Sequence, residues 1–157
     1  MKPWLVVFHL EPRPRSPRGD AATHARFSAW NAQRPLPPDF ARRVGALGLP
    51  PAEGGEGSPR RWGRPDGNQL EMREGEAGEI VVRVAIDTRK LDPGFAAGLL
   101  ALVKASNAVL VRGDGLMIDG TVGAFSKALR SSPAWAHVDD PTGLLTGREP
   151  AGGGEEA

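Results

Sequence analysis

The clearest alternation of hydrophobic and polar positions lies over residues 79–87, EIVVRVAID. The hydrophobic positions on one face of an extended chain are Ile80, Val82, Val84 and Ile86. The other face carries the charged side chains Glu79, Arg83 and Asp87, with Val81 and Ala85 between them. A period of two with many β-branched residues predicts a strand. Because one face is hydrophobic and the other is polar, the pattern favours a mixed or antiparallel sheet.

The first 50 residues predict a strand followed by short helices. Residues 3–10 are apolar on both faces, which is typical of a central or covered strand. The prolines of residues 11–20 predict a loop, and residues 21–33 are weakly helical. Asp39 is a candidate N-cap for a further short helix that ends near Gly48.

The remaining elements form two similar groups. Residues 68–73 and 79–87 predict a hairpin. Asp92 and Pro93 then predict the start of a helix, as its N-cap and first residue. A second hairpin follows over residues 108–118, and a second helix ends before Ser132-Pro133. The predicted apolar stripes of the two helices are Phe95, Leu99, Leu102 and Val103, and Val122, Phe125 and Leu129. Trp135 and Val138 are expected to pack as an apolar flap.

This order of elements predicts an α+β fold. A β-β-α-β-β-α unit gives a two-layer sandwich with a mainly antiparallel sheet, to which an N-terminal strand and short helices are added. The predicted divisions are residues 1–50, packed on the main domain, a flexible linker over residues 51–61, the α+β core over residues 62–145, and a disordered tail over residues 146–157.

Composition narrows the class of protein. Cysteine is absent, which excludes disulfides and thiolate chemistry. No apolar run approaches the roughly 20 residues that span a bilayer, so we expect a soluble, cytoplasmic protein without a membrane partner. Arg, Ala, Gly and Pro are abundant, as in bacteria with GC-rich genomes. Residues 1–65 hold eleven Lys or Arg against five Asp or Glu, whereas the rest of the chain is acidic.

Catalytic chemistry has little support in the sequence. The three histidines are scattered, and no pair has metal-binding spacing. Asp87, Asp114 and Asp119 fall at ends of strands or in turns, where they could converge with His137 as in a metal-dependent hydrolase. Turns also select Asp for local hydrogen bonding. We therefore assign no catalytic residue, metal or cofactor, and keep the hydrolase as an alternative.

Arginine-rich loops give a nucleic-acid alternative. One loop carries Arg13, Arg15 and Arg18, and in another Arg60, Arg61 and Arg64 flank Trp62. Arginines beside an exposed Trp could grip phosphate and stack a base. The same residues could instead let Trp62 cover the edge of the core while the arginines extend into solvent.

A stable platform with few catalytic residues favours a protein-binding or accessory module, for example an inhibitor or immunity-type partner, as a monomer or homodimer. The expected binding residues are those of the Trp62 loop, which are Arg60, Arg61, Trp62 and Arg64. To these we add the polar face of the central strand, which carries Glu79, Arg83 and Asp87.

Overall fold

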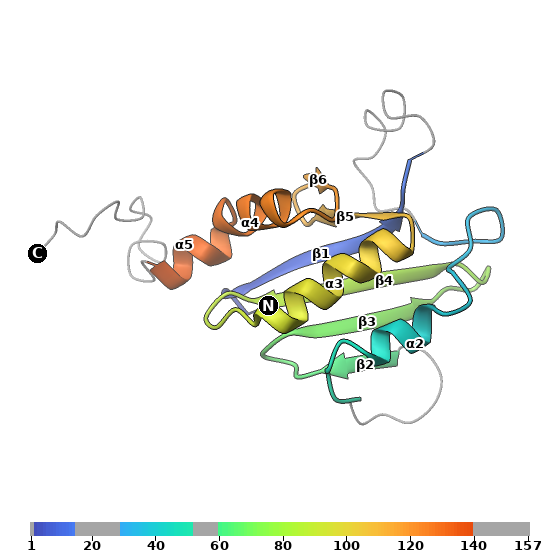
Figure 1. Cartoon of the computed structure of the whole chain (residues 1–157), viewed down its shortest axis with the longest axis horizontal. Coiled ribbons are helices and arrows are strands. Elements are labelled where there is room, and N and C mark those ends of the chain that lie inside the picture. Colours follow the sequence, from blue (N-terminus) through green and yellow to red (C-terminus); the bar gives the residue numbers. More distant parts are fainter. Residues whose placement is uncertain (1, 15–28, 52–59, 140–157) are drawn as a thin grey trace, which may run out of the picture.

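A computed structural model describes residues 2–14, 29–51 and 60–139. Across these residues, six strands form one antiparallel sheet in the order β2-β3-β4-β1-β5-β6 (Figure 1). The strands are β1 (Leu5–Pro12), β2 (Arg60–Gly63), β3 (Gln69–Glu74), β4 (Ile80–Asp87), β5 (Ala108–Arg112) and β6 (Met117–Ile118). Together with four helices in the described residues, this sheet confirms the predicted α+β class.

β1 comes first in the chain but lies at the centre of the sheet, between β4 and β5. Phe8 of β1 lies opposite Val84 of β4 and Arg112 of β5. Both neighbours are antiparallel to β1. On its core face Val6, Phe8 and Leu10 are buried, whereas Val7 and His9 on the other face are only partly buried. The sheet is therefore completed by a strand that is distant in sequence from the two hairpins.

The two predicted hairpins are present. β3 and β4 pair from Gln69↔Ala85 to Glu74↔Ile80, and β5 pairs with the two-residue strand β6. Gly78 and Gly115 have positive φ angles of 83° and 95° in the two connecting turns. Glycine adopts such angles without the steric cost that a Cβ brings, so these turns match the local sequence.

The helices α2 (Phe40–Gly45) and α3 (Pro93–Ala105) lie across one face of the sheet (Figure 1). The Asp92 carboxylate caps α3 by accepting hydrogen bonds from the amides of Gly94 and Phe95 at 2.9 and 3.1 Å. The buried residues of α3 are Phe95, Leu99, Leu100, Leu102 and Val103. Each buried side chain of this size stabilises the fold by roughly 1.5–3 kcal/mol before entropy is subtracted.

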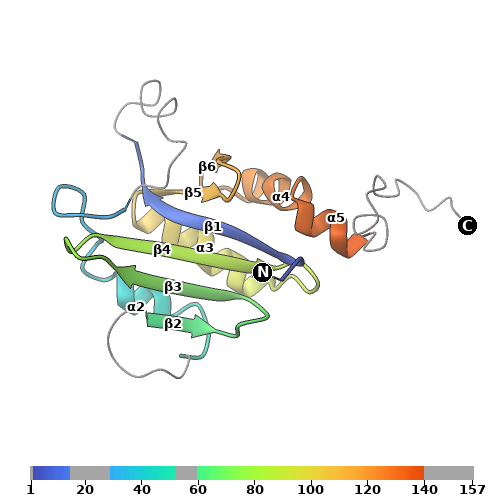
Figure 2. The same ribbon diagram turned by 180° about the vertical axis from the view of Figure 1, so that it is seen from behind.

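Two further helices follow the second hairpin, α4 (Val122–Arg130) and α5 (Pro133–Asp139). Phe125 of α4 packs on Phe8 with the ring centroids 5.8 Å apart, which places α4 on the same side of the sheet as α3. Seen from behind, the strands β3, β4 and β1 stand in front of α3, and no helix of the described residues covers them (Figure 2).

Some local expectations need correction. The first strand continues through Glu11 and Pro12, because Pro12 needs no amide hydrogen where it pairs with Ala108. Trp135 and Val138 belong to the helix α5 rather than to a flap, since Pro133 is at its first position and suits a helix start. Most of the weak helix of residues 21–33 lies outside the described residues, and Trp30 forms a bridge with Ile80.

The proposed divisions of the chain keep their status as predictions. β1 and α2 both belong to the one sheet-and-helix body, consistent with an N-terminal part packed on the main domain. Residues 52–59 of the predicted linker and the whole tail over residues 146–157 lie outside the described part of the chain. Among the described helices, none is long and apolar enough to cross a bilayer.

Candidate functional site

The sheet face opposite α3 carries a row of side chains from all six strands. The pairing register places them side by side in the order Arg61, Glu71, Arg83, His9, Val111 and Met117. We call this set the cross-sheet row. It begins with alternating charges on β2, β3 and β4 and ends with Val111 of β5, which is buried, and Met117 of β6, which is partly buried. This face is the one turned toward the viewer in Figure 2.

Glu71 holds two arginines at the exposed end of the row. Its Oε2 lies 2.8 Å from Nε of Arg61 and 3.5 Å from an Nη atom of Arg73. The Glu71 side chain is only 12% exposed, whereas those of Arg61 and Arg73 are 55% and 57% exposed. The carboxylate therefore lies beneath the two guanidinium groups, whose remaining N–H donors face outward.

His9 and Arg83 occupy the centre of the row and lie opposite each other on β1 and β4. Both are partly buried. Burial lowers the pKa of His9 first, and the positive charge of Arg83 lowers it further. At neutral pH His9 is therefore uncharged, and Arg83 is the formal charge at this point of the face.

Beside the row, this face carries both polar and apolar side chains. Val81 lies opposite Arg73, and Val7 lies opposite Ala85. None of the six strands contains a lysine, because the four lysines of the chain fall in helices, loops or the N-terminal residues. Protein interfaces are enriched in arginine and methionine and depleted of lysine. The strands of this face have the same composition.

Trp62 lies on the other face of the sheet. Its side chain belongs to the core and is 8% exposed, and the guanidinium of Arg60 lies 5.0 Å from the ring centroid. Trp62 thus covers the edge of the core with Arg60 across it, which was one of the two interpretations of this loop. The indole ring is not presented to a base from solvent.

The seven predicted binding residues do not form a single site. Arg83 and Arg61 are neighbours in the cross-sheet row through Glu71. Glu79 lies before β4, where it accepts a hydrogen bond from the Ala77 amide at 3.0 Å. Asp87 lies at the opposite end of the same strand.

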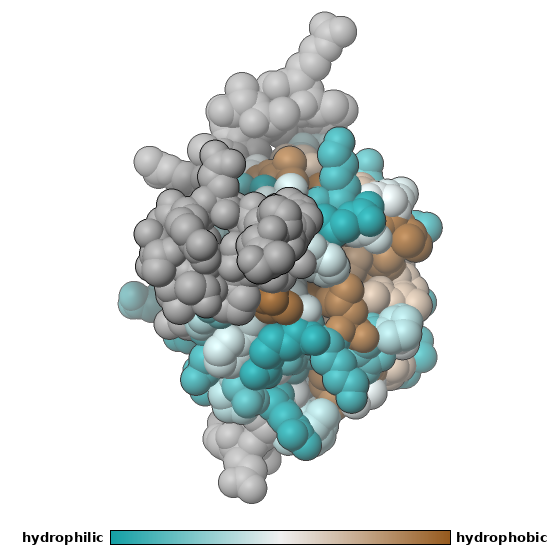
Figure 3. Space-filling model, turned by 90° about the vertical axis from the view of Figure 1, so that its left-hand side faces the viewer, coloured by the Kyte–Doolittle hydropathy of each residue, from teal (hydrophilic) through white to brown (hydrophobic). Residues whose placement is uncertain are grey.

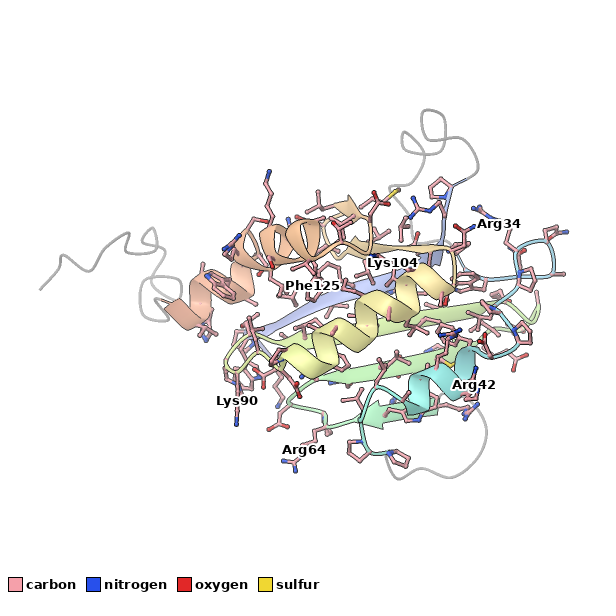
Figure 4. The ribbon with its side chains drawn as sticks, in the orientation of Figure 1. Arg34, Arg42, Arg64, Lys90, Lys104 and Phe125 are labelled. Carbon is pink, nitrogen blue, oxygen red and sulfur yellow. The ribbon has the colours of Figure 1, made fainter. Side chains whose placement is uncertain are left out.

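Arg64 and Asp87 line a common cleft of about 630 Å³ between the β2–β3 turn and the β4–α3 loop. Lys90 lines the same cleft, and Figure 4 shows Arg64 and Lys90 at this end of the molecule. The cleft is thus lined by charges of both signs, and it lies apart from the row.

Asp87 is held by a compact polar cluster. Its two carboxylate oxygens accept hydrogen bonds from Nε and an Nη atom of Arg89 at 3.0 and 2.9 Å, and the guanidinium of Arg89 lies 4.1 Å from the centroid of the Trp4 ring. Burial alone raises the pKa of Asp87, but the hydrogen bonds and charge of Arg89 lower it more, so the net shift is downward. The arrangement stabilises this loop, and both carboxylate oxygens are occupied by hydrogen bonds from Arg89.

The candidate acidic residues of a hydrolase are each paired with a different arginine. Asp87 pairs with Arg89, and Asp114 pairs with Arg112 at 2.7 Å. Asp119 pairs with Arg13 at 2.8 Å. Within the described ranges, no three His, Asp or Glu side chains gather as metal ligands would. His137 belongs to α5.

The arginine loops do not meet in the part of the chain that the structure describes. The side chain of Arg13 reaches Asp119 and the carbonyl of Ala108, on the β5–β6 side of the sheet. Arg60, Arg61 and Arg64 belong to β2 and its turn, at the opposite edge. Arg15 and Arg18 lie outside the described residues.

Sequence reasoning missed His9, Glu71 and Arg73 as members of the polar face. The alternation of Gln69, Glu71 and Arg73 along β3 was a usable signal, since these residues share one face of the strand. No such signal existed for His9, because it becomes a neighbour of Arg83 only when β1 pairs with β4.

Comparison of the chain with protein-family models, with curated proteins and with solved structures gave no match. Function is therefore inferred from geometry and chemistry alone.

Proposed function

We propose that this protein is a non-catalytic protein-binding or accessory module whose partner docks on the sheet face opposite α3. The observation that supports this most is the alternating series Arg61, Glu71 and Arg83, set among aliphatic side chains on a face that no described helix covers. The role of an inhibitor or immunity-type factor, in a bacterial cell, is part of the proposal.

Rigidity is the first support. Each residue of the row belongs to a strand, and β4 and β1 are paired on both edges. A site built on paired strands holds its side chains in fixed positions, so little conformational entropy is lost when a partner binds. The shared contact with Glu71 further restricts Arg61 and Arg73 before any partner arrives.

Chemistry is the second support. Arginine binds partners through planar donors and aliphatic stems, and it is enriched where proteins meet. Val7 and Val81 are partly buried and supply apolar area beside the arginines. A nucleic-acid surface would more typically gather cations into one basic stripe, whereas the row alternates in sign and the described arginines divide between opposite edges.

The test is capture of a partner with wild-type protein and with charge-reversal variants of the row. Tagged protein is incubated with lysate of its source organism with and without nuclease, and the bound material is identified by mass spectrometry. Arg83→Glu and Arg61→Glu alter the proposed surface. Lys104→Glu reverses a charge on the helix side of the molecule, as Figure 4 shows, and is the matched control.

We expect one dominant protein that survives nuclease, is retained by Lys104→Glu and is lost with Arg83→Glu. Thermal unfolding followed by circular dichroism verifies that each variant is folded, and Arg83→Gln replaces Arg83→Glu if the reversal unfolds the chain. Capture that nuclease removes would favour the nucleic-acid alternative. A protein captured equally by all variants would contradict the placement of the site on this face.

A further inference from the structure

A second candidate site lies at the end of the sheet where β1 begins. A cavity of about 370 Å³, open to solvent on one side, is lined there by Leu5, Val6 and Val7 of β1, by the turn after β5, and by Pro133 and Ala134 of α5. Its walls are almost entirely apolar. Figure 3 views this end of the molecule and shows hydrophobic surface between hydrophilic side chains.

One wall of the cavity is an unpaired length of strand. β5 pairs with β1 only from Phe8 to Pro12, and beyond that pairing the amide of Gly113 donates to the Val7 carbonyl at 3.1 Å. The Leu5 amide donates to the Lys2 carbonyl, also at 3.1 Å. The Leu5 carbonyl and the Val7 amide face the same side and have no hydrogen-bond partner among the described residues.

The Leu5 carbonyl and the Val7 amide are spaced as at the unpaired edge of a β-strand. In a β-sheet, the carbonyl of one residue and the amide of the residue two positions later face the same neighbouring strand. The edge opposite Val6 can therefore receive one donor and one acceptor from an extended chain. A ligand that docks among the apolar walls excludes water from these two groups, so it must itself supply one donor and one acceptor, since unpaired polar groups are costly.

The cavity is held in shape by Arg112. Its guanidinium donates to the Asp114 carboxylate at 2.7 Å, to the Ala128 carbonyl at 2.6 Å and to Oγ of Ser131 at 2.8 Å. These contacts join the turn after β5 to the C-terminal end of α4, directly before the α5 residues that line the cavity. A ligand would thus enter a preformed space, which lowers the entropic cost of binding.

Lys2 also lines the cavity, and its ammonium group forms no ion pair with a residue that the structure describes. A ligand with a carboxylate near this point would form an ion pair with this exposed lysine. Charge therefore adds a preference for an acidic group to the apolar volume and the strand edge.

We infer that this cavity binds an extended, partly acidic peptide segment of a partner protein. The segment adds as a short strand beside Leu5–Val7, inserts one large apolar side chain between Val6 and Pro133, and places an acidic group near Lys2. A second copy of this chain is a poor source of the segment, because its own β1 edge lies inside the same kind of cavity. The inference concerns a site separate from the cross-sheet row and does not depend on the proposed function.

The experiment begins with amide hydrogen exchange measured by NMR on the full chain. The amide of Val7 should exchange much faster than those of Val6 and Phe8, which lie on the β4 side of the strand. The probe is then a hexapeptide of alternating leucine and glutamate, acetylated and amidated at its ends. We expect it to shift the Val7 amide resonance and to slow its exchange.

Two glycines provide matched variants. A Cβ at Gly113, which lines the cavity, or at Gly123, which is in α4, would meet no atom within 4 Å, and neither glycine has a positive φ. Gly113→Leu fills the cavity and should abolish peptide binding, whereas Gly123→Leu makes the same chemical change elsewhere and should leave it intact. The same peptide N-methylated at alternate residues loses the donor for the Leu5 carbonyl and should bind about tenfold more weakly.

Each contrary result overturns the inference. Slow exchange of the Val7 amide in the free protein would mean that the edge is already filled, by another segment of this chain or by a second copy, and sedimentation would tell these two apart. Equal binding of the N-methylated peptide would mean that the cavity takes an apolar ligand rather than a strand. Equal shifts in Gly113→Leu, or no shift at millimolar peptide, would exclude the cavity as the site.

Discussion

Arg112 and Asp114 form a two-pronged ion pair across the turn that joins β5 to β6. Nε and an Nη atom of Arg112 donate to the two carboxylate oxygens of Asp114 at 2.9 and 2.7 Å. The pair is asymmetric in its environment, because the Arg112 side chain is 12% exposed and that of Asp114 is 59% exposed. The arginine therefore links a buried helix end to a solvated turn, and its loss has structural consequences.

Arg112→Met should lower the free energy of unfolding by about 2–3 kcal/mol, because the buried carbonyl of Ala128 loses its charged donor. Arg130→Met is the matched control, since Arg130 is exposed at the end of α4 and should change stability by less than about 0.5 kcal/mol. Urea denaturation measures both. Equal effects of the two substitutions would contradict the role given to Arg112.

The acid sensitivity of the same pair follows from its titration. The hydrogen bond from Arg112 lowers the pKa of Asp114 from 3.8 to about 2. Because the folded-state pKa is the lower one, the unfolded chain binds the proton first, and the stabilisation is complete above about pH 4 and declines as the pH falls toward 2. Asp114→Asn should flatten this part of the stability profile. An unchanged acid profile in that variant would show that the pair does not contribute.

His9 provides a direct test of the centre of the cross-sheet row. Burial is the larger cause of its lowered pKa and the charge of Arg83 the smaller, so Arg83→Gln should raise the pKa of His9 without restoring the ordinary value of 6.5. NMR titration of the imidazole signals measures the shift. Arg42→Gln, which removes a charge from α2 on the other side of the molecule, should leave the His9 pKa unchanged. No change with Arg83→Gln would contradict the pairing of these two strands.

Two glycines near α4 should respond to alanine in opposite directions. Gly123→Ala introduces a Cβ into open space within a helix and should stabilise the protein by about 0.5–1 kcal/mol. Gly120→Ala places a Cβ 3.0 Å from Cγ1 of Val103 and 3.3 Å from the carbonyl of Leu100, and should destabilise it by about 1–3 kcal/mol. Thermal unfolding distinguishes the two. Stabilisation by both would mean that the contact between α3 and residue 120 is loose.

Local patterns in the sequence predicted the regular elements because those elements satisfy their own hydrogen bonds and bury one face. The alternation in β4, the Asp92-Pro93 start of α3 and the turn glycines are all short-range features. The apolar character of both faces of β1 also predicted a central strand. α5 was missed because only seven residues form it and its first residue, Pro133, also suits the end of the preceding helix.

The site could be predicted only in part, since a binding surface needs side chains from several strands. The sequence by itself determined which side chains of each strand share a face, including Arg83 on the polar side of β4, because the period of a strand is two. Only the tertiary structure decided that Arg61, Glu71, Arg83 and His9 lie in one row, that Trp62 is buried, and that the β1 edge at Val7 opens into a cavity. These relationships depend on the order and register of strands that are distant in the chain, which local alternation does not encode.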